Sequence, residues 1–273
     1  MKLIDFDGLF DEKLTVYMEE NKGKYTEMQW EDIIPKLYKK FGDTYVAKVK
    51  CTPKEYYAKM TDEQLVQTLS MHLEQDVPVS EFLCDEIENR GVVETLTPML
   101  ASGDTEKAVY AFNLIGDSPL AFDAYFSLLT KEDTDEDLKS DVTDVFKAHA
   151  DEVKERALES YKKGEAIEAM LEILSRVTEK EDEIYQILLK AFLSYTNIPM
   201  HASYLAAYGD ERALKHLLNK IEDRSIGFVE FQELKYAIEA LGGEYDEPRD
   251  FSGDKDYLEI ETQTSRQIKE IES

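Results

Sequence analysis

One helix ending recurs through the middle of the chain at intervals of about 31 residues. Small and apolar residues lead into a Gly-Asp or Gly-Gly pair at three positions and into His-Ala-Asp at a fourth; the four stretches are 111–117, 145–151, 204–210 and 237–243. Gly242 follows Gly116 by 126 positions, which is four steps averaging 31.5. The fifth member is 166–176, which has no glycine. Such a period predicts stacked copies of one supersecondary unit.

Apolar residues within each step follow helical spacing, as in Val109, Phe112 and Ile115. Glycine and proline lie mostly between such stretches, and the one strand-like segment, 45–51, is short and isolated. We therefore predict an all-α protein of about fourteen helices, each of roughly 10–16 residues. Helix starts are indicated by N-cap or first-turn residues at Thr61, Ser80, Asp104, Pro119, Pro199 and Asp210.

Each step holds two helices. We expect the glycine to form a left-handed C-cap and the aspartate to cap the next helix. The pattern resembles the HEAT-like α-solenoid, in particular the short repeat of phycobilisome-lyase-type proteins, whose helix ending reads A-L-G-x-I-G-D. The resemblance covers residues 91–243 and implies a right-handed stack of antiparallel helix pairs. Tetratricopeptide and armadillo hairpins remain open alternatives, although the tetratricopeptide Trp/Gly/Tyr/Pro pattern is absent.

The repeat divides the chain into three predicted parts. Residues 1–90 form a helical N-terminal region of degenerate repeats or of other hairpins, and residues 91–243 carry the HEAT-like repeats. Residues 244–273 form an acidic tail with ten acidic and four basic residues. We expect this tail to wrap the last repeat or to stay mobile, with Ile268 and Ile271 of a final amphipathic turn as candidate docking residues.

The charge of the whole chain limits its partners. It has 32 basic and 59 acidic residues, a formal charge of −27. We expect no nucleic-acid or anionic-membrane partner, because both require basic surfaces. Acidic residues interrupt the N-terminus where a signal peptide needs an apolar run, and no stretch reaches the ~20 apolar residues of a membrane span. Cys51 and Cys84 are too few for a disulfide framework. These features predict a cytoplasmic protein with two reduced core thiols.

Motifs for metal or catalytic chemistry are weak. Metal-dependent HEAT hydroxylases carry His-Glu pairs, whereas none of the histidines at 72, 149, 201 and 216 precedes a glutamate. We predict that His149, at an apolar repeat position, is buried. The segment 250–261 has calcium-loop acids, but Lys255 stands where the turn needs glycine. We expect no metal, no cofactor and no catalytic residue.

The repeat register predicts which side chains are buried and which point outward. Phe112, Phe146, Leu205 and Ile238 share one position and are expected in the core. The outward pairs are Tyr110/Asn113, Asp144/Lys147, Ser203/Ala206 and Tyr236/Glu239. Since second helices line the concave face of HEAT-type stacks, we predict partner contacts from Tyr110, Asn113, Lys147, Tyr236 and Glu239. The alternative is that the tyrosines only cover neighbouring turns.

The leading hypothesis is a non-catalytic cytosolic scaffold or adaptor that binds a protein or peptide, preferably a basic one, through the concave face. An enzyme or enzyme-accessory protein with a pocket between repeats and no sequence motif is the alternative. A self-associating structural protein is a third possibility. Two or more carboxylates converging in a deep pocket would favour the enzyme.

Overall fold

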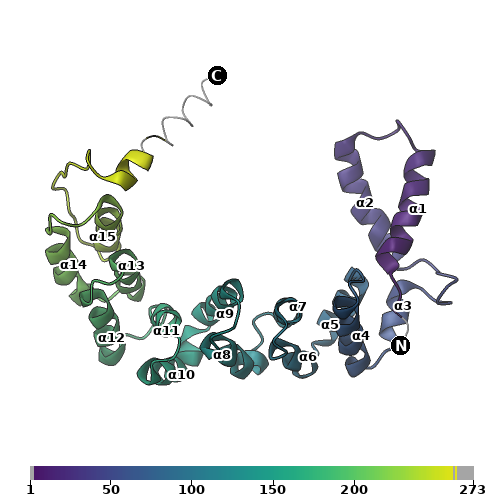
Figure 1. Cartoon of the computed structure of the whole chain (residues 1–273), viewed down its shortest axis with the longest axis horizontal. Helices are drawn as coiled ribbons and strands as arrows, with labels where there is room; N and C mark the ends of the chain where they lie inside the picture. The colour runs from purple at the N-terminus through teal and green to yellow at the C-terminus, as the bar shows by residue number, and fades with distance from the viewer. Residues whose placement is uncertain (1–2, 261, 263–273) are drawn as a thin grey trace. The chain divides into compact units, whose positions relative to one another are not determined.

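The structure, a computed structural model, describes residues 3–260 and 262, and these confirm the predicted all-α class. Within them the only β pairing is an isolated antiparallel bridge between Val46 and Cys51. The chain folds into two compact units, Met1–Lys139 and Ser140–Ser273. Figure 1 labels the helices.

Unit 1 contains α1 to α8 and the start of α9. The helices are α1 (Phe6–Glu20), α2 (Glu27–Phe41), α3 (Pro53–Ala58), α4 (Asp62–Glu74), α5 (Glu81–Arg90), α6 (Val93–Leu100), α7 (Thr105–Ile115), the 3₁₀ helix η1 (Pro119–Ala121), α8 (Phe122–Thr130) and α9 (Glu136–Ala148). Helices α6 and α7 form a tight pair, while α4 packs on α5 and α6, and α5 on α7. Neighbours in sequence are therefore neighbours in space.

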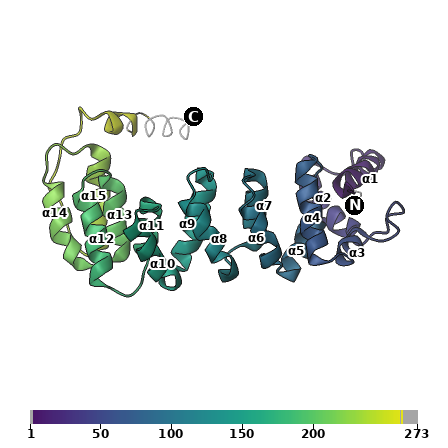
Figure 2. The ribbon, with the colours of Figure 1, turned by 60° about the horizontal axis from the view of Figure 1, so that its bottom comes forward.

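Unit 2 consists of the rest of α9 and three further helix pairs. These are α10 (Ala150–Lys163) with α11 (Ile167–Leu174), α12 (Asp182–Leu193) with α13 (Ile198–Tyr208), and α14 (Leu214–Ile221) with α15 (Phe228–Ala240); the 3₁₀ helix η2 (Glu211–Ala213) precedes α14. The second helices also contact one another, α11 with α13 and α13 with α15. Figure 2 shows this part in teal to yellow-green.

Helix starts follow the capping residues in the sequence. The Thr61 hydroxyl accepts a hydrogen bond from the backbone N–H of Gln64 in a capping box, and Ser80 and Asp104 cap α5 and α7. Asp210 caps η2, a 3₁₀ turn rather than an α-helix. Gly209 is a left-handed C-cap, as predicted. Gly116, in contrast, has φ 63° and ψ −138°, so the expectation of a left-handed cap there is wrong.

The predicted repeat core is confirmed. Phe112 is 9% exposed, and Phe146, Leu205 and Ile238 are at most 1% exposed. These four residues belong to four different helices, α7, α9, α13 and α15. Residues that share this repeat position are therefore buried in each of the four helices.

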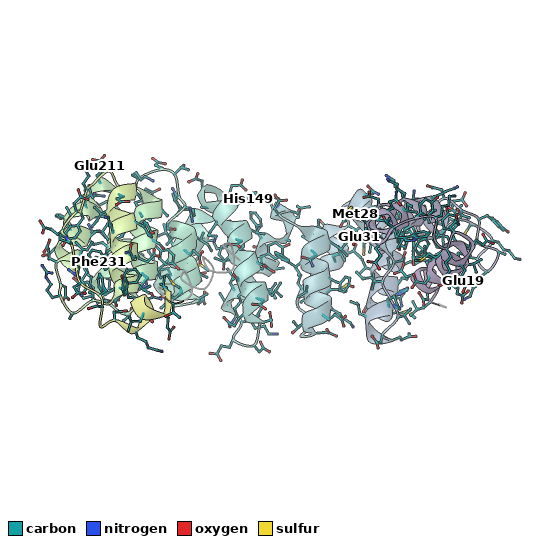
Figure 3. The ribbon with its side chains drawn as sticks, turned by 90° about the horizontal axis from the view of Figure 1, so that it is seen from above. Glu19, Met28, Glu31, His149, Glu211 and Phe231 are labelled. Atoms are coloured by element: carbon teal, nitrogen blue, oxygen red, sulfur yellow. The ribbon has the colours of Figure 1, made fainter. Side chains whose placement is uncertain are left out.

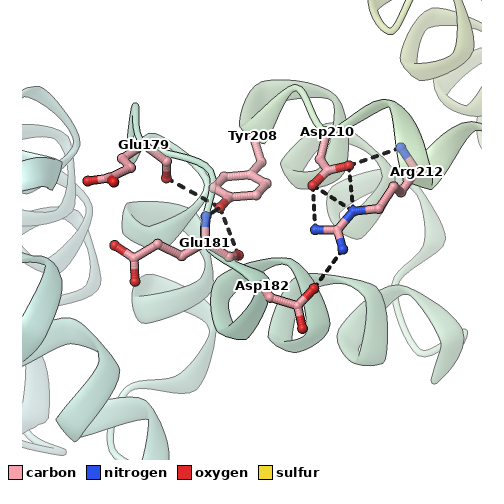
Figure 4. Close-up of polar contacts among 6 residues, drawn as sticks. All are labelled: Glu179, Glu181, Asp182, Tyr208, Asp210 and Arg212. Atoms are coloured by element: carbon pink, nitrogen blue, oxygen red, sulfur yellow. Dashed lines mark hydrogen bonds and ion pairs between the residues drawn. The ribbon is translucent and has the colours of Figure 1, made fainter.

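Polar contacts join each helix pair of unit 2 to the next. The backbone N–H and hydroxyl of Thr178 donate to Asp151, and the Arg212 guanidinium bonds both Asp210 and Asp182. The Tyr208 hydroxyl lies between these sites, on the backbone that leads into α12 (Figure 4). Asp182 and Arg212 belong to successive pairs, so their contact sets the offset between one pair and the next, whereas the Tyr208 contact lies within the α12–α13 pair.

The C-terminal segment packs on the last helix pair. The Phe251 ring lies against Phe228 and Phe231 of α15, and Tyr245 is buried beside Phe231. Arg249 donates to the carbonyl oxygens of Ile221 and Asp223 and stacks over the Phe231 ring. Wrapping of the last repeat is thus confirmed for the first part of the tail. The predicted docking residues Ile268 and Ile271 lie outside the described residues.

Candidate protein-binding face

The five predicted contact residues fall in both units. Tyr110 and Asn113 belong to α7 of unit 1, and Lys147, Tyr236 and Glu239 belong to α9 and α15 of unit 2. Each group is therefore considered within its own unit.

In unit 2, α15 presents a continuous exposed stripe. Its residues lie seven and three positions apart, which places them on one face of a helix: Val229 (39% exposed), Tyr236 (60% exposed) and the exposed Glu239. The opposite side carries the buried Leu234 and Ile238. Tyr236 and Glu239 are thus accessible side chains on the same face.

Helix α13 adds a second stripe beside it. Met200 is 40% exposed, and Ser203 and Ala207 continue the same face. Since α13 packs on α15, the two stripes lie on neighbouring helices. They offer small and apolar side chains with one large aromatic ring.

Lys147 forms ion pairs with two acidic neighbours. Its Nζ atom lies 2.5 Å from Asp144 Oδ1 and 2.7 Å from Glu172 Oε1 of α11. Burial lowers the pKa of Lys147, but the hydrogen bonds to the two carboxylates outweigh this and raise it above its ordinary value. Lys147 therefore links α9 to α11.

Helix α11 supplies further acidic residues that the sequence reasoning missed. Glu168 lies 3.3 Å from Nε2 of His201, which is 2% exposed. Burial raises the pKa of Tyr204, and the nearby carboxylates of Glu172 and Glu168 raise it further. The sequence signal for these residues is weak. The 166–176 stretch has no glycine, so its alignment with the other repeats is not fixed.

Together these side chains define the second-helix face of unit 2. It comprises Asp144 and Lys147 of α9, Glu168 and Glu172 of α11, Met200 and Ser203 of α13, and Tyr236 and Glu239 of α15. These residues carry four carboxylates and one ammonium group, and Lys235 adds a second ammonium group 3.9 Å from Glu239 Oε1, so the face keeps a net negative charge. It combines this charge with an exposed tyrosine and an exposed methionine, which are common contact residues at protein interfaces.

In unit 1 the two predicted residues differ in accessibility. Asn113 is exposed, whereas Tyr110 is half-buried, and burial raises the pKa of its hydroxyl group. Part of the Tyr110 ring therefore packs within unit 1, as the alternative interpretation of the tyrosines expects.

The prediction that His149 is buried is wrong. It lies between α9 and α10, with 20% of its side chain exposed and Nδ1 3.3 Å from Glu152 Oε1 (Figure 3). No glycine follows it, and α10 begins at Ala150, so the position is a helix junction rather than a core site.

Other residues with metal-binding character serve local structure. Asp254 accepts hydrogen bonds from the backbone N–H groups of Phe228, Asp256 and Tyr257, and Asp250 accepts one from Ser252. Across residues 3–260 and 262, no group of three or more His, Cys, Asp or Glu side chains is placed to hold a metal ion.

Unit 1 has a pocket of about 480 Å³ between α6 and α8. Thr97, Pro98 and Leu128 line it, and its charged lining residues are Asp123 and Lys131. Two converging carboxylates, which would favour an enzyme, are not present in this pocket. A smaller pocket of unit 1, of about 40 Å³, is lined by Asp104, Asp133 and Asp135. Of these, Asp104 and Asp135 accept backbone hydrogen bonds at the starts of α7 and α9.

Both cysteines are free thiols. Cys51 is buried, as expected, but Cys84 is only half-buried. Burial and nearby carboxylates raise the pKa of Cys84 to about 11, so its thiol is protonated at neutral pH. Among the helices of the described residues, none combines the length and the apolar character needed to cross a bilayer.

Comparison with known proteins gives no relative: no family model, no curated protein and no solved structure matches this chain.

Proposed function

We propose that the chain is a non-catalytic scaffold or adaptor that binds a basic protein segment through the second-helix face of unit 2. We further propose that its helix pairs stack as a right-handed HEAT-like solenoid, with this face on the concave side. The observation that carries the proposal is the composition of the face: four carboxylates and an ion-paired lysine occur on the same series of helices as the exposed Tyr236 and Met200.

Charge and aromatic contact have different roles in such a complex. Carboxylates attract a cationic partner over about a Debye length, ~8 Å at physiological ionic strength, and so raise the association rate. The Tyr236 ring offers a large contact area with few rotatable bonds, and so lowers the dissociation rate. We therefore expect the association rate to fall as salt rises, while the loss of Tyr236 mainly accelerates dissociation.

The experiment is a quantitative affinity capture from a cell extract with the full chain as bait, at low and at high salt. The test variant is Tyr236→Ala with Glu239→Lys, both at exposed positions of α15. The matched control is Glu155→Lys with Glu159→Lys, at exposed positions of α10. Cationic proteins captured by the unaltered chain should be lost with the test variant and kept with the control. Equal capture by all three baits would contradict the proposal.

A further inference from the structure

The hairpin of α1 and α2 buries few of its own side chains. Of its two 15-residue helices, only Phe6, Phe10 and Phe41 are buried. These lie near the base of the hairpin, where Phe6 contacts Tyr56 and Tyr57 and Phe41 contacts Phe82. Figure 1 shows the hairpin projecting from α3, α4 and α5. Toward its tip, Val16 is 56% and Met28 is 78% exposed.

One side of the hairpin forms an apolar groove of about 190 Å³. Its apolar lining residues are Phe10, Leu14 and Tyr17 of α1 and Leu37 and Phe41 of α2. On α1 these have spacings of four and three, so one helical stripe borders the groove along about two turns. Leu14, Tyr17 and Leu37 are half-buried and therefore partly accessible, whereas Phe10 and Phe41 are buried at the base of the groove.

The charged residues of the groove are both lysines. Lys13 and Lys40 border it, and the Nζ atom of Lys13 lies 4.9 Å from the centre of the Phe41 ring. Within residues 3–260 and 262, neither lysine forms an ion pair. The surrounding sequence is also unusual for this chain, because residues 36–59 contain seven lysines and only two acidic residues.

This charge is segregated along the chain. Residues 1–60 contain 11 lysines and 11 acidic residues and are neutral overall, so residues 61–273 carry the whole charge of −27. The hairpin itself, residues 6–41, contains six lysines and eight acidic residues, so attraction of an anionic partner would come locally from Lys13 and Lys40 at the groove.

We propose that this groove binds an acidic amphipathic helix of a partner protein. A helix laid between α1 and α2 would cover the stripe of Phe10, Leu14 and Leu37 and complete a three-helix arrangement, as in helix-in-groove recognition. Acidic side chains flanking its apolar face would meet Lys13 and Lys40. This site is distinct from the acidic second-helix face, which suits a basic partner, and the two can be tested separately.

The chain contains a fluorescent reporter beside the groove. Trp30 is the only tryptophan, and its ring centre lies 6.1 Å from that of the groove residue Tyr17. The probe is an 18-residue synthetic helix with leucine at positions spaced three and four apart and glutamate and alanine elsewhere. A second peptide has lysine in place of every glutamate. Trp30 emission of the full chain is recorded during titration with each peptide.

We expect the glutamate peptide to bind at least about tenfold more tightly than the lysine peptide. Lys13→Glu with Lys40→Glu should weaken it by a further factor of about ten without changing the melting temperature, since both lysines are exposed. The matched control is Lys36→Glu with Lys39→Glu, two exposed residues of α2 that do not line the groove. It should change the affinity by less than about threefold.

Several results would overturn the proposal. One is that the glutamate peptide causes no change in Trp30 emission, and another is that both peptides bind with equal affinity. A third is that the groove and control variants weaken binding of the glutamate peptide equally. Light scattering that shows a dimer abolished by the groove variant would assign the groove to a second copy of the chain. In the capture experiment, the groove variant should still retain the cationic partners. This result keeps the test of the groove independent of the proposed function.

Discussion

The hydroxyl group of Tyr208 in α13 accepts a 2.6 Å hydrogen bond from the backbone N–H of Glu181, 27 residues earlier. Tyr208 is fully buried, and its ring also lies under the Lys180 ammonium group. Glu181 is the N-cap of α12 and makes no side-chain cap of its own. A side chain of one helix of the pair thus satisfies a backbone group at the start of the other (Figure 4).

Replacing Tyr208 with phenylalanine tests this contact. The ring keeps its packing, but the Glu181 N–H loses its partner, so the free energy of unfolding should fall by about 1–3 kcal/mol. Urea denaturation measures the change. Tyr236→Phe, at a 60% exposed position of the same unit, is the control and should leave the stability within about 0.5 kcal/mol.

A second prediction concerns the repeat core. Phe112→Ala removes a buried ring that contacts Tyr125, and transfer and cavity effects together should cost about 3–5 kcal/mol of unfolding free energy. A loss below about 1 kcal/mol in urea would show that the residue contributes little to the core.

Two tyrosine variants separate packing from binding. Tyr110→Ala should lower the melting temperature, because the half-buried ring packs within unit 1. Tyr236→Ala should leave it unchanged, because the ring is exposed, and should instead weaken capture of a cationic partner. A lowered melting temperature with unchanged capture in the Tyr236 variant would remove this residue from the proposed face.

The Asp210–Arg212 pair predicts an acid-dependent stability. Hydrogen bonds from Arg212 lower the pKa of Asp210 below its ordinary value of 3.8. The unfolded chain therefore binds the proton more tightly, so the stabilisation is complete above about pH 4 and is lost as pH falls through the folded pKa.

Urea titrations at several pH values between neutrality and about pH 2 should show the difference between the wild-type chain and Asp210→Asn shrinking as the medium becomes more acidic. A difference that does not depend on pH would contradict the assignment.

The sequence is a good guide to the elements that depend on local chemistry. Thr61, Ser80 and Asp104 cap helices as predicted, because capping needs only residues within three positions. The shared core position of Phe112 and Phe146 was also predictable from the repeat. His149 was not, since its environment depends on α10 beginning directly after α9.

The candidate site was only partly predictable. Exposure of Tyr236 and Glu239 follows from helical periodicity. The ion pair between Lys147 and Glu172 does not, because it depends on how α9 and α11 are placed against each other in three dimensions. The groove between α1 and α2 was not predicted, because it lies before residue 91, where the sequence shows no clear repeat.

The polar contacts between successive helix pairs of unit 2 join residues 25 to 33 positions apart, from Lys147–Glu172 to Glu168–His201. Each of these contacts joins one helix pair to the next. In repeat proteins, too, each repeat contacts only its neighbours. A pulling force on the two ends of this unit would therefore act on each of these contacts between helix pairs. The unit would lengthen in steps of about one helix pair, and each step would release roughly 30 residues. Under force, the unit would therefore unfold in successive steps of similar length.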